Sequence, residues 1–243
     1  MDMTVIPAPV TAQARQIEAI LFDKDGTLFD FGATWEVWAQ ALLLRLCTQD
    51  ADRAAAAGWG IGFDMKACRF LPDSIAIAGT AGQVAEALAP HVPDLSVAQV
   101  LAMLNDEAER TPQVEAVPLG PFLDRLRGLG LKLGVATNDA ENPARAHLGA
   151  AGVIDRFDFI AGFDSGHGAK PGPGQLLAFA KAVGVAPHLV AMVGDSSHDL
   201  IAGRSAGMVT VGVLTGIADA GDLAAFADVI LPDISHLHAW LGR

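Results

Sequence analysis

The pattern of apolar and polar positions has its clearest feature at residues 17–28. Residues 17–22 form a short apolar run flanked by polar residues, which predicts a buried strand. The run ends on Asp23 and Asp25, with Gly26 directly after them. Ligands of an open parallel sheet lie beyond the carboxyl ends of its strands, so both acids stand where a site is expected. Because carboxylates this close repel each other, we expect a positive charge between them, and a metal ion would supply it.

The segment that begins at Asp23 also fits a plain turn or the start of a calcium-binding loop. A calcium loop of the EF-hand type has its glycine at the sixth position, whereas Gly26 is the fourth residue counted from Asp23. The calcium loop is therefore excluded. The choice between a plain turn and a functional site depends on the rest of the chain.

Residues 34–115 have a different pattern, without strand-like alternation. Ala, Leu, Gln and Arg dominate this segment, and Trp35 and Trp38 begin a series of apolar residues at helical spacing. We interpret both tryptophans as core residues, not as a stacking platform. Ser96 with Gln99 three residues later predicts a capping box. The predicted helices run from residue 34 onward, over 81–88 and over 97–110.

From residue 122 onward, helices and strands alternate regularly. Such alternation predicts parallel pairing of the strands through right-handed crossovers. Glycines at positions 130, 184 and 207 mark the ends of three helices. The predicted helices cover 122–129, 142–151, 175–183 and 199–206, and the predicted strands cover 131–136, 157–163, 189–193, 209–214 and 229–231.

The first predicted strand precedes the helical segment, and its neighbours in the sheet follow it. We therefore predict an α/β domain formed by residues 1–30 and 116–243, with residues 31–115 inserted as a helical domain. Prolines and glycines at 112–121 mark the return linker. Since the insertion leaves and re-enters near the strand end that carries Asp23 and Asp25, it is placed to act as a lid.

Composition narrows the class of protein. The 243 residues are 51% hydrophobic, which is enough for a sizeable core and argues against disorder. The formal net charge of −12 argues against nucleic acid and membrane as partners, because both attract proteins rich in Lys and Arg. Cys47 and Cys68 match neither a zinc site nor a disulfide framework. Residues 1–16 lack the features of a secretion signal, and no apolar run is long enough to span a bilayer. We expect a cytoplasmic protein with a loosely held N-terminal extension.

Four predicted strand ends, or the loops after them, carry polar side chains. Parallel strands bring their carboxyl ends to one edge of a sheet, so these groups are expected to converge. Each alone has a simpler explanation: a helix cap at 137–138, a solvated loop at 170–171, and a turn with an N-cap at 194–199. A phosphate-binding P-loop is excluded because Gly-Lys-Ser/Thr is absent. The groups are Asp23 with Asp25, Thr137 with Asn138, Lys170, and Asp195 with Asp199.

Together these segments resemble the signature motifs of the haloacid dehalogenase superfamily of hydrolases, and within it the phosphoglycolate phosphatase-type branch. This resemblance implies a Rossmann-like parallel sheet core with an inserted all-helical cap domain. Lys24 stands where the family usually has an apolar residue, and we expect this position to tolerate substitution. Segments 117–121 and 206–213 fit the same branch. Four segments of this sequence are similar to the four family motifs. The first motif is matched by Asp-Lys-Asp-Gly-Thr-Leu at 23–28, the second by Thr137-Asn138, the third by Lys170-Pro171, and the fourth by residues 194–199.

The resemblance also implies hydrolysis of a phosphate monoester with Mg²⁺ as cofactor. Asp23 would be the nucleophile that takes the phosphoryl group, and Asp25 the general acid and base. Asp23, the backbone carbonyl of Asp25, and Asp195 would hold Mg²⁺. Thr137 and the Asn138 backbone would bind phosphate oxygens, and Lys170 would neutralise the charge of these oxygens. Asp199 would orient Lys170 or a metal-bound water. Thr27 would support the site.

Other functions of the same scaffold stay open. A dehalogenase needs the nucleophile but neither the second acid nor magnesium, so Asp25 and Asp195 argue against it. A phosphomutase or a phosphonatase would need cap residues that we do not identify. Outside the enzymes, the alternative is a catalytically silent binding protein. The expected partner is a small phosphorylated metabolite, with phosphoglycolate first and sugar phosphates or nucleotides second, and the oligomeric state is left open.

A substrate such as phosphoglycolate carries a carboxylate that needs a countercharge. The core edge is rich in acids, so the basic residues of the insertion are the candidates. Arg69 lies in the irregular stretch 62–72, where a loop could face the core, and we name it as a candidate substrate-binding residue. A solvated surface pair with Lys66 is the simpler alternative. The basic residues of the insertion are Arg45, Arg53, Lys66, Arg69 and Arg110.

Overall fold

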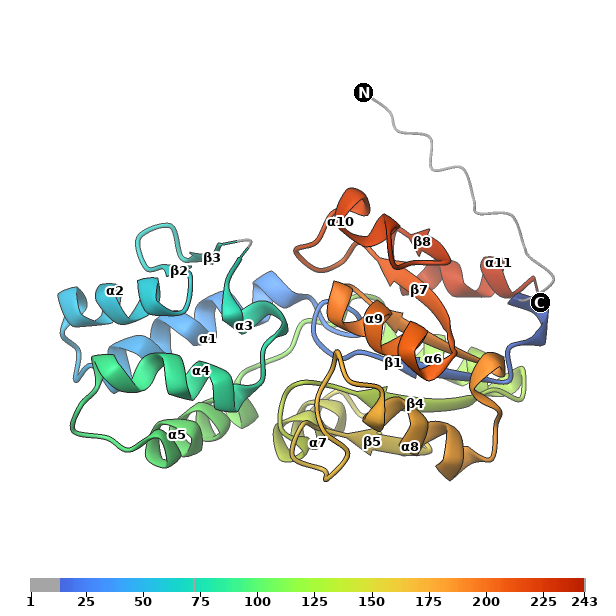
Figure 1. Cartoon of the computed structure of the whole chain (residues 1–243), viewed down its shortest axis with the longest axis horizontal. Helices are drawn as coiled ribbons and strands as arrows, with labels where there is room; N and C mark the ends of the chain where they lie inside the picture. The colour runs from blue at the N-terminus through green and yellow to red at the C-terminus, as the bar shows by residue number, and fades with distance from the viewer. Residues whose placement is uncertain (1–13, 72, 243) are drawn as a thin grey trace.

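The computed structural model describes residues 14–71 and 73–242. Figure 1 shows two parts, with helices α1 to α5 on the left and a sheet flanked by helices on the right. The extension expected at residues 1–16 lies outside the described residues, except for a single 3₁₀ turn at Ala14–Gln16.

A sheet of six parallel strands forms the centre of the α/β part, which confirms the predicted fold class. All four residues of β1 are buried, because the sheet is covered on both faces. The predicted strands are all present, within a few residues at their ends. In the order β5-β4-β1-β6-β7-β8 the strands are β5 (Phe159–Ala161), β4 (Lys132–Ala136), β1 (Ala19–Phe22), β6 (Val190–Gly194), β7 (Val209–Val213) and β8 (Val229–Leu231).

Helices cover both faces of this sheet, and the side chains of β1 divide between them. Ile20 and Phe22 belong to a core with α6, α7 and α11, whereas Ala19 and Leu21 belong to a core with α8 and α9. This division follows the period of two along a strand. The helices are α6 (Leu119–Gly128), α7 (Glu141–Ala150), α8 (Gly174–Val183), α9 (Ser197–Ala206), α10 (Ala220–Ala224) and α11 (Leu237–Leu241), with 3₁₀ turns at Ile154–Arg156, Pro187–Leu189 and Ile234–His236.

The inserted part has a hydrophobic core of its own, which contains Trp35 and Trp38 as predicted. The capping box of Ser96 and Gln99 is present at the start of α5. One feature differs from the prediction: the stretch interpreted as irregular contains a short antiparallel hairpin, β2 with β3. The elements are α1 (Phe31–Leu46), α2 (Ala51–Gly60), β2 (Phe63–Asp64), β3 (Arg69–Phe70), α3 (Ile75–Ala78), α4 (Ala81–Leu88), a 3₁₀ turn at Ala89–His91 and α5 (Val97–Arg110).

Two linkers join the parts, and they run side by side next to the end of β1. The backbone N–H of Asp30 donates to the carbonyl of Val114 at 2.8 Å, and the N–H of Ala116 donates to the carbonyl of Leu28 at 2.9 Å. The insertion therefore begins and ends close to the acids that follow β1. The domain boundaries at residues 30–31 and 115–116 stay a prediction. They lie in the two linkers that these hydrogen bonds join.

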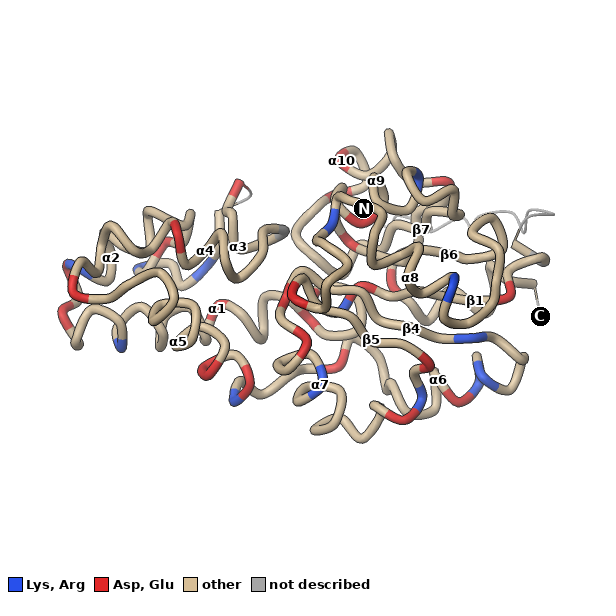
Figure 2. Tube along the Cα trace, turned by 60° about the horizontal axis from the view of Figure 1, so that its bottom comes forward, with Lys and Arg blue, Asp and Glu red and all other residues tan. Residues whose placement is uncertain are grey.

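Basic and acidic residues are mixed over the described part of the chain. Figure 2 shows Lys and Arg positions scattered among Asp and Glu positions over both parts. The absence of a nucleic-acid partner, expected from the formal net charge of −12, stays a prediction. None of the described helices is long and apolar enough to cross a bilayer.

Candidate active site

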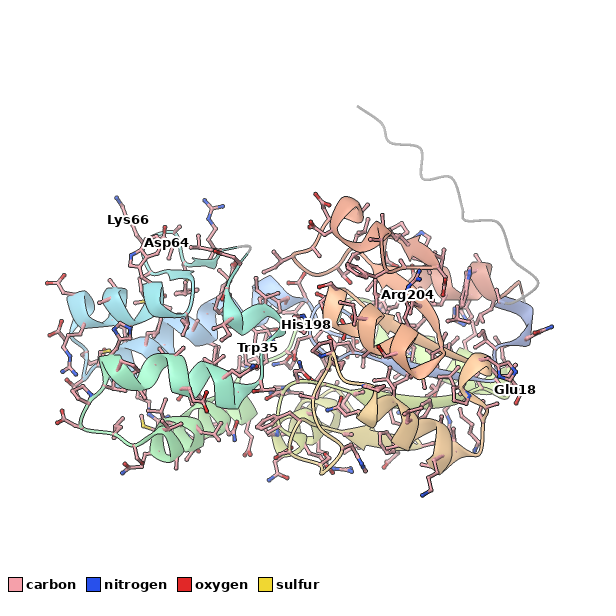
Figure 3. All side chains as sticks on the ribbon, in the orientation of Figure 1. Glu18, Trp35, Asp64, Lys66, His198 and Arg204 are labelled. Atoms are coloured by element: carbon pink, nitrogen blue, oxygen red, sulfur yellow. The ribbon has the colours of Figure 1, made fainter. Side chains whose placement is uncertain are left out.

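A cavity of about 90 Å³ lies between the carboxyl edge of the sheet and the inserted part. This volume is several times the roughly 10–15 Å³ that one water molecule needs on the same measure. Figure 3 labels Trp35 and His198 at the junction of the two parts, and both residues line the cavity. From the sheet edge, the predicted residues that line it are Asp23, Asp25, Thr137, Asn138, Lys170 and Asp199.

Lys170 is the centre of a buried ion triple. Its Nζ lies 2.6 Å from Oδ1 of Asp23 and 2.6 Å from Oδ1 of Asp199. Asp199 is fixed in turn, because its Oδ2 accepts hydrogen bonds from the N–H and the Oγ of Ser196 at 3.1 and 2.7 Å. Three charges that follow β1, β5 and β6 thus meet at one place, as parallel strands allow.

The side chain of Asn138 fixes the backbone of Lys170. Its Nδ2 donates to the Lys170 carbonyl at 2.9 Å, and its Oδ1 accepts from the Lys170 N–H at 2.9 Å. Sequence analysis assigned Asn138 only a backbone role toward phosphate. Thr137 lies alongside, with its backbone carbonyl bound by Gln175 Nε2 at 3.0 Å and its Oγ1 bound by the N–H of Asp139 at 3.0 Å.

Burial dominates the electrostatics of this group. It raises the pKa of Asp23 to about 7, against the lowering effect of the Lys170 charge. Burial, followed by the charges of Asp23 and Asp199, raises the pKa of Asp195 well above its ordinary value. For Lys170, burial acts to lower the pKa, but the carboxylates of Asp199 and Asp23 outweigh it and raise the pKa. The ammonium group of Lys170 therefore does not balance the negative charges of Asp23, Asp195 and Asp199.

Asp195 is held in a narrow space made by glycines. A Cβ at Gly26 or at Gly216 would collide with the Asp195 carboxylate, so only glycine allows the close approach. Gly26 also has a φ of 77°, which residues with a Cβ rarely adopt. Thr27, a predicted supporting residue, donates from Oγ1 to Oδ1 of Asp195 at 3.4 Å.

These buried acids fit a hard divalent cation. Asp23, Asp195 and Asp199 each offer a carboxylate oxygen, and the three oxygens lie within 4.8 Å of one another. All-oxygen sites of this kind suit Mg²⁺. Asp199 joins the two predicted carboxylate ligands here. The side chain of Asp25 faces elsewhere, and its expected contribution was a backbone carbonyl.

Lys24 and its partners form a second buried network, which sequence analysis missed. The Lys24 side chain has no exposed surface, and its Nζ lies 2.7 Å from Oδ1 of Asp25 and 3.3 Å from Oδ2 of Asp139. The same oxygen of Asp25 accepts from Nε1 of Trp35 at 2.8 Å. Position 24 is therefore fully engaged, which does not support the tolerance that we expected there. The available signal was a lysine inside a buried strand end, since a buried charge needs a partner.

His147 completes this network. Burial, and then the charge of Lys24, lower the pKa of His147 to about 4, so the ring is neutral near pH 7. Its Nδ1 accepts from Lys24 Nζ at 3.0 Å, and its Nε2 donates to the carbonyl of Ala108 in α5 at 2.7 Å. Burial also raises the pKa of Asp139 to about 6, against the effect of Lys24. Through Trp35 and Ala108, the network joins Asp25 to both ends of the insertion.

Three predicted site residues do not line the cavity: Asp195 and Thr27, which lie behind it in the acid cluster, and Arg69, which has no contact with that cluster among the described interactions. Arg69 lies on β3 with its side chain exposed, and the cavity is lined by its neighbour Phe70 instead. Its role in binding substrate stays a prediction without support from this geometry.

Comparisons with known proteins place these features in a family. A family model described as haloacid dehalogenase-like hydrolase matches residues 17–207. A protein named "Probable phosphatase IndB" from Dickeya dadantii is 37% identical over 108 residues, which cover 44% of this chain and 47% of that protein. A phosphoglycolate phosphatase from Escherichia coli O157:H7 is 29% identical over 239 residues, which cover 94% of each. The chain spans about half the length of the first curated relatives that it matches.

Solved structures agree on the fold. The crystal structure of CbbY from Rhodobacter sphaeroides, in complex with phosphate, superimposes with a TM-score of 0.69 at 21% identity. The match covers 93% of this chain and 100% of that one. The family model over residues 17–207 confirms the resemblance inferred from the four motifs, and the solved structure agrees with the fold.

The acid cluster predicts an unusual effect of Asp195→Asn. Groups whose carboxyl pKa is raised on folding stabilise the protein below pH 4, and this stability is lost as the pH rises through the folded pKa, about 7 for Asp23. In chelator at pH 8, Asp195→Asn should therefore melt higher than wild type, by roughly 4–8 °C for a gain of about 2 kcal/mol. Mg²⁺ should raise the melting temperature of wild type only.

Differential scanning calorimetry from pH 4 to 8, with and without Mg²⁺, measures this effect. Asp94→Asn, which changes an exposed acid in the loop before α5, is the control and should behave as wild type. Equal melting of wild type and Asp195→Asn in chelator at pH 8 would contradict the repulsion among these carboxylates. A persistent Mg²⁺ shift in Asp195→Asn would exclude Asp195 as a metal ligand.

The second network predicts a large cost for Lys24→Met. Methionine keeps the apolar stem but removes the ammonium group, which leaves Asp25 and Asp139 without their cation. Breaking a buried ion pair costs about 3–5 kcal/mol, which urea unfolding can measure. The matched control is Lys132→Met, because Lys132 is half exposed and pairs with Asp158 at the surface, where the loss should be about 0–1 kcal/mol. Similar small losses for the two variants would contradict a structural role for Lys24.

Proposed function

The chain belongs to the haloacid dehalogenase-like hydrolase family, and from this premise we propose that it is a Mg²⁺-dependent phosphatase that hydrolyses a small phosphate monoester. The observation that carries the proposal is the ion triple of Asp23, Lys170 and Asp199 beside Asp195, at the edge of the cavity. Several relatives are named phosphoglycolate phosphatase, so phosphoglycolate is the first substrate to test.

In the first step, Asp23 is the nucleophile. A carboxylate oxygen of Asp23 forms a bond to phosphorus while the ester P–O bond breaks, so the phosphoryl group passes to the enzyme. Lys170 binds Oδ1 of Asp23 at 2.6 Å and keeps a positive charge beside the reacting group. This charge acts on the negative charge that develops on the phosphoryl oxygens.

Asp25 moves the protons in both steps. Its Oδ1 already accepts hydrogen bonds from Lys24 and Trp35, so a proton on Asp25 resides on Oδ2. That proton goes to the departing alcohol. A water molecule then gives a proton back to Asp25 and attacks phosphorus, which releases inorganic phosphate and restores the Asp23 carboxylate.

Thr137 and the metal ligands complete the proposal. Thr137 lines the cavity next to Asn138, and the proposal assigns the Thr137 hydroxyl and the Asn138 backbone N–H to phosphate oxygens. Held by Asp23, Asp195 and the Asp25 carbonyl, with Asp199 nearby, Mg²⁺ would offset the repulsion between an anionic nucleophile and an anionic phosphate.

Asp23→Asn should abolish turnover of 4-nitrophenyl phosphate, with a fall in kcat of roughly 10³-fold or more. The amide keeps the shape of the side chain but cannot take the phosphoryl group. Steady-state kinetics measures the loss, and circular dichroism with thermal melting checks that the fold is intact. Asp94→Asn again serves as the control. Ordinary activity in a folded Asp23→Asn protein would exclude the covalent mechanism.

Removal of divalent metal should stop catalysis, and added Mg²⁺ should restore it. The reason is the buried acid cluster, which lacks enough positive charge of its own to accept a phosphate dianion. The assay is hydrolysis of 4-nitrophenyl phosphate after treatment with chelator, followed by titration with Mg²⁺. Full activity in excess chelator would refute the metal role and favour dehalogenase chemistry on this scaffold.

A further inference from the structure

The wall of the cavity that the insertion supplies is apolar. It comes from α1, from the hairpin, and from α3 to α5, opposite the acids of the sheet edge. Trp35 and Trp38 meet edge to face, with ring centroids 4.9 Å apart. The large apolar side chains of this wall are Phe31, Trp35, Trp38, Phe70, Val84 and Leu104.

The basic residues of the insertion do not reach this wall. All five have exposed side chains, and none of them lines the cavity. Arg45 pairs with Asp106 and Glu107 at the surface, and Arg110 pairs with Asp106. Figure 3 shows Lys66 pointing into solvent on the outer side of the insertion, away from Trp35 and His198. A carboxylate on the substrate would find no cation here.

The sheet edge offers little more. Lys170 is already paired with Asp23 and Asp199, and Lys24 with Asp25 and Asp139. His198 also lines the cavity, and its buried Nδ1 has no hydrogen-bond partner among the described residues.

A second carboxylate in this cavity would therefore lie between the acids of the sheet edge and an apolar wall. Removing a carboxylate from water without a partner costs several kcal/mol, which opposes binding. An aromatic or aliphatic group would instead gain about 25 cal/mol for each Å² of apolar surface buried against the tryptophans. The neutral amide of Asn105 is the polar side chain that α5 adds to this wall.

We propose that the enzyme prefers phosphate monoesters whose alcohol is uncharged and apolar, with an aromatic ring as the best occupant, over carboxylated esters such as phosphoglycolate. This proposal rests on the phosphatase function proposed above and names its substrate class. The sheet edge binds the phosphoryl group, and the wall of the insertion binds the alcohol.

The test compares benzyl phosphate with phosphoglycolate. Both are esters of primary alcohols, so the comparison depends mainly on what the wall binds. We expect kcat/KM to be at least roughly tenfold higher for benzyl phosphate, equivalent to about 1.4 kcal/mol. Trp38→Ala should lower kcat/KM for benzyl phosphate, mostly through KM, and should lower it more for benzyl phosphate than for methyl phosphate, because methyl phosphate is too small to contact the wall.

A charge placed in the wall provides the converse test. Ala76 lines the cavity from α3, and Ala76→Lys should raise kcat/KM for phosphoglycolate relative to benzyl phosphate. Ala56→Lys is the matched control, because Ala56 is exposed on α2 and does not line the cavity. Thermal melting checks that both variants fold.

Binding separates failure of this proposal from failure of the proposed function. Titration calorimetry with Asp23→Asn and Mg²⁺ ranks the two esters without turnover. If benzyl phosphate binds more tightly than phosphoglycolate but wild type hydrolyses neither ester, the apolar wall binds the alcohol as proposed and the phosphatase function is refuted. Faster hydrolysis of phosphoglycolate than of benzyl phosphate would refute the proposed substrate class but not the phosphatase function. If His198→Gln then lost the preference for phosphoglycolate, His198 would be the residue that binds the substrate carboxylate.

Discussion

The constraint on which this structure depends is the burial of several like charges at one edge of a sheet. Asp23, Asp195 and Asp199 converge there, and Lys170 pairs directly with Asp23 and Asp199. Burial raises the pKa of Asp23 to about 7, because a buried site disfavours the charged form of a carboxyl group. The Asp23 carboxyl group therefore binds a proton more readily in the folded chain than in water. Glycines, linkers and helix caps around the edge serve to keep these groups at short range. The reactivity of the site and the cost of folding it have the same origin.

The two buried lysines, Lys170 and Lys24, pair with different carboxylates. Lys170 pairs with Asp23, the proposed nucleophile, and with Asp199, whereas Lys24 pairs with Asp25 and Asp139. The second group extends into the insertion through Trp35 and the carbonyl of Ala108. The proposed acid and base is therefore held by both parts of the protein. A shift of the insertion would change the surroundings of Asp25 more than those of Asp23.

Much of the fold could be predicted from the sequence because it depends on local pattern. The parallel strands and the polar residues that follow them have a clear periodicity, and parallel pairing brings them together without knowledge of side chains. The partners of Lys24 were not predictable in this way, since His147 is 123 positions away along the chain. The same holds for Arg69, whose sequence neighbourhood does not show that Phe70, not Arg69, faces inward. The hairpin β2–β3 is too short to have a periodic signal.

The pairing of the two linkers has a consequence for how such a protein can change. The carbonyl of Val114 and the N–H of Asp30 are hydrogen-bonded, so some eighty residues leave the core and return to it at almost the same point. A segment attached in this way can be lengthened, shortened or exchanged without altering the path of the sheet, because the closure of the loop does not depend on its contents. Selection, or a protein engineer, can therefore replace the insertion, which supplies the proposed alcohol-binding wall, as a single cassette. The α/β part, which carries the proposed catalytic residues, is left as it is.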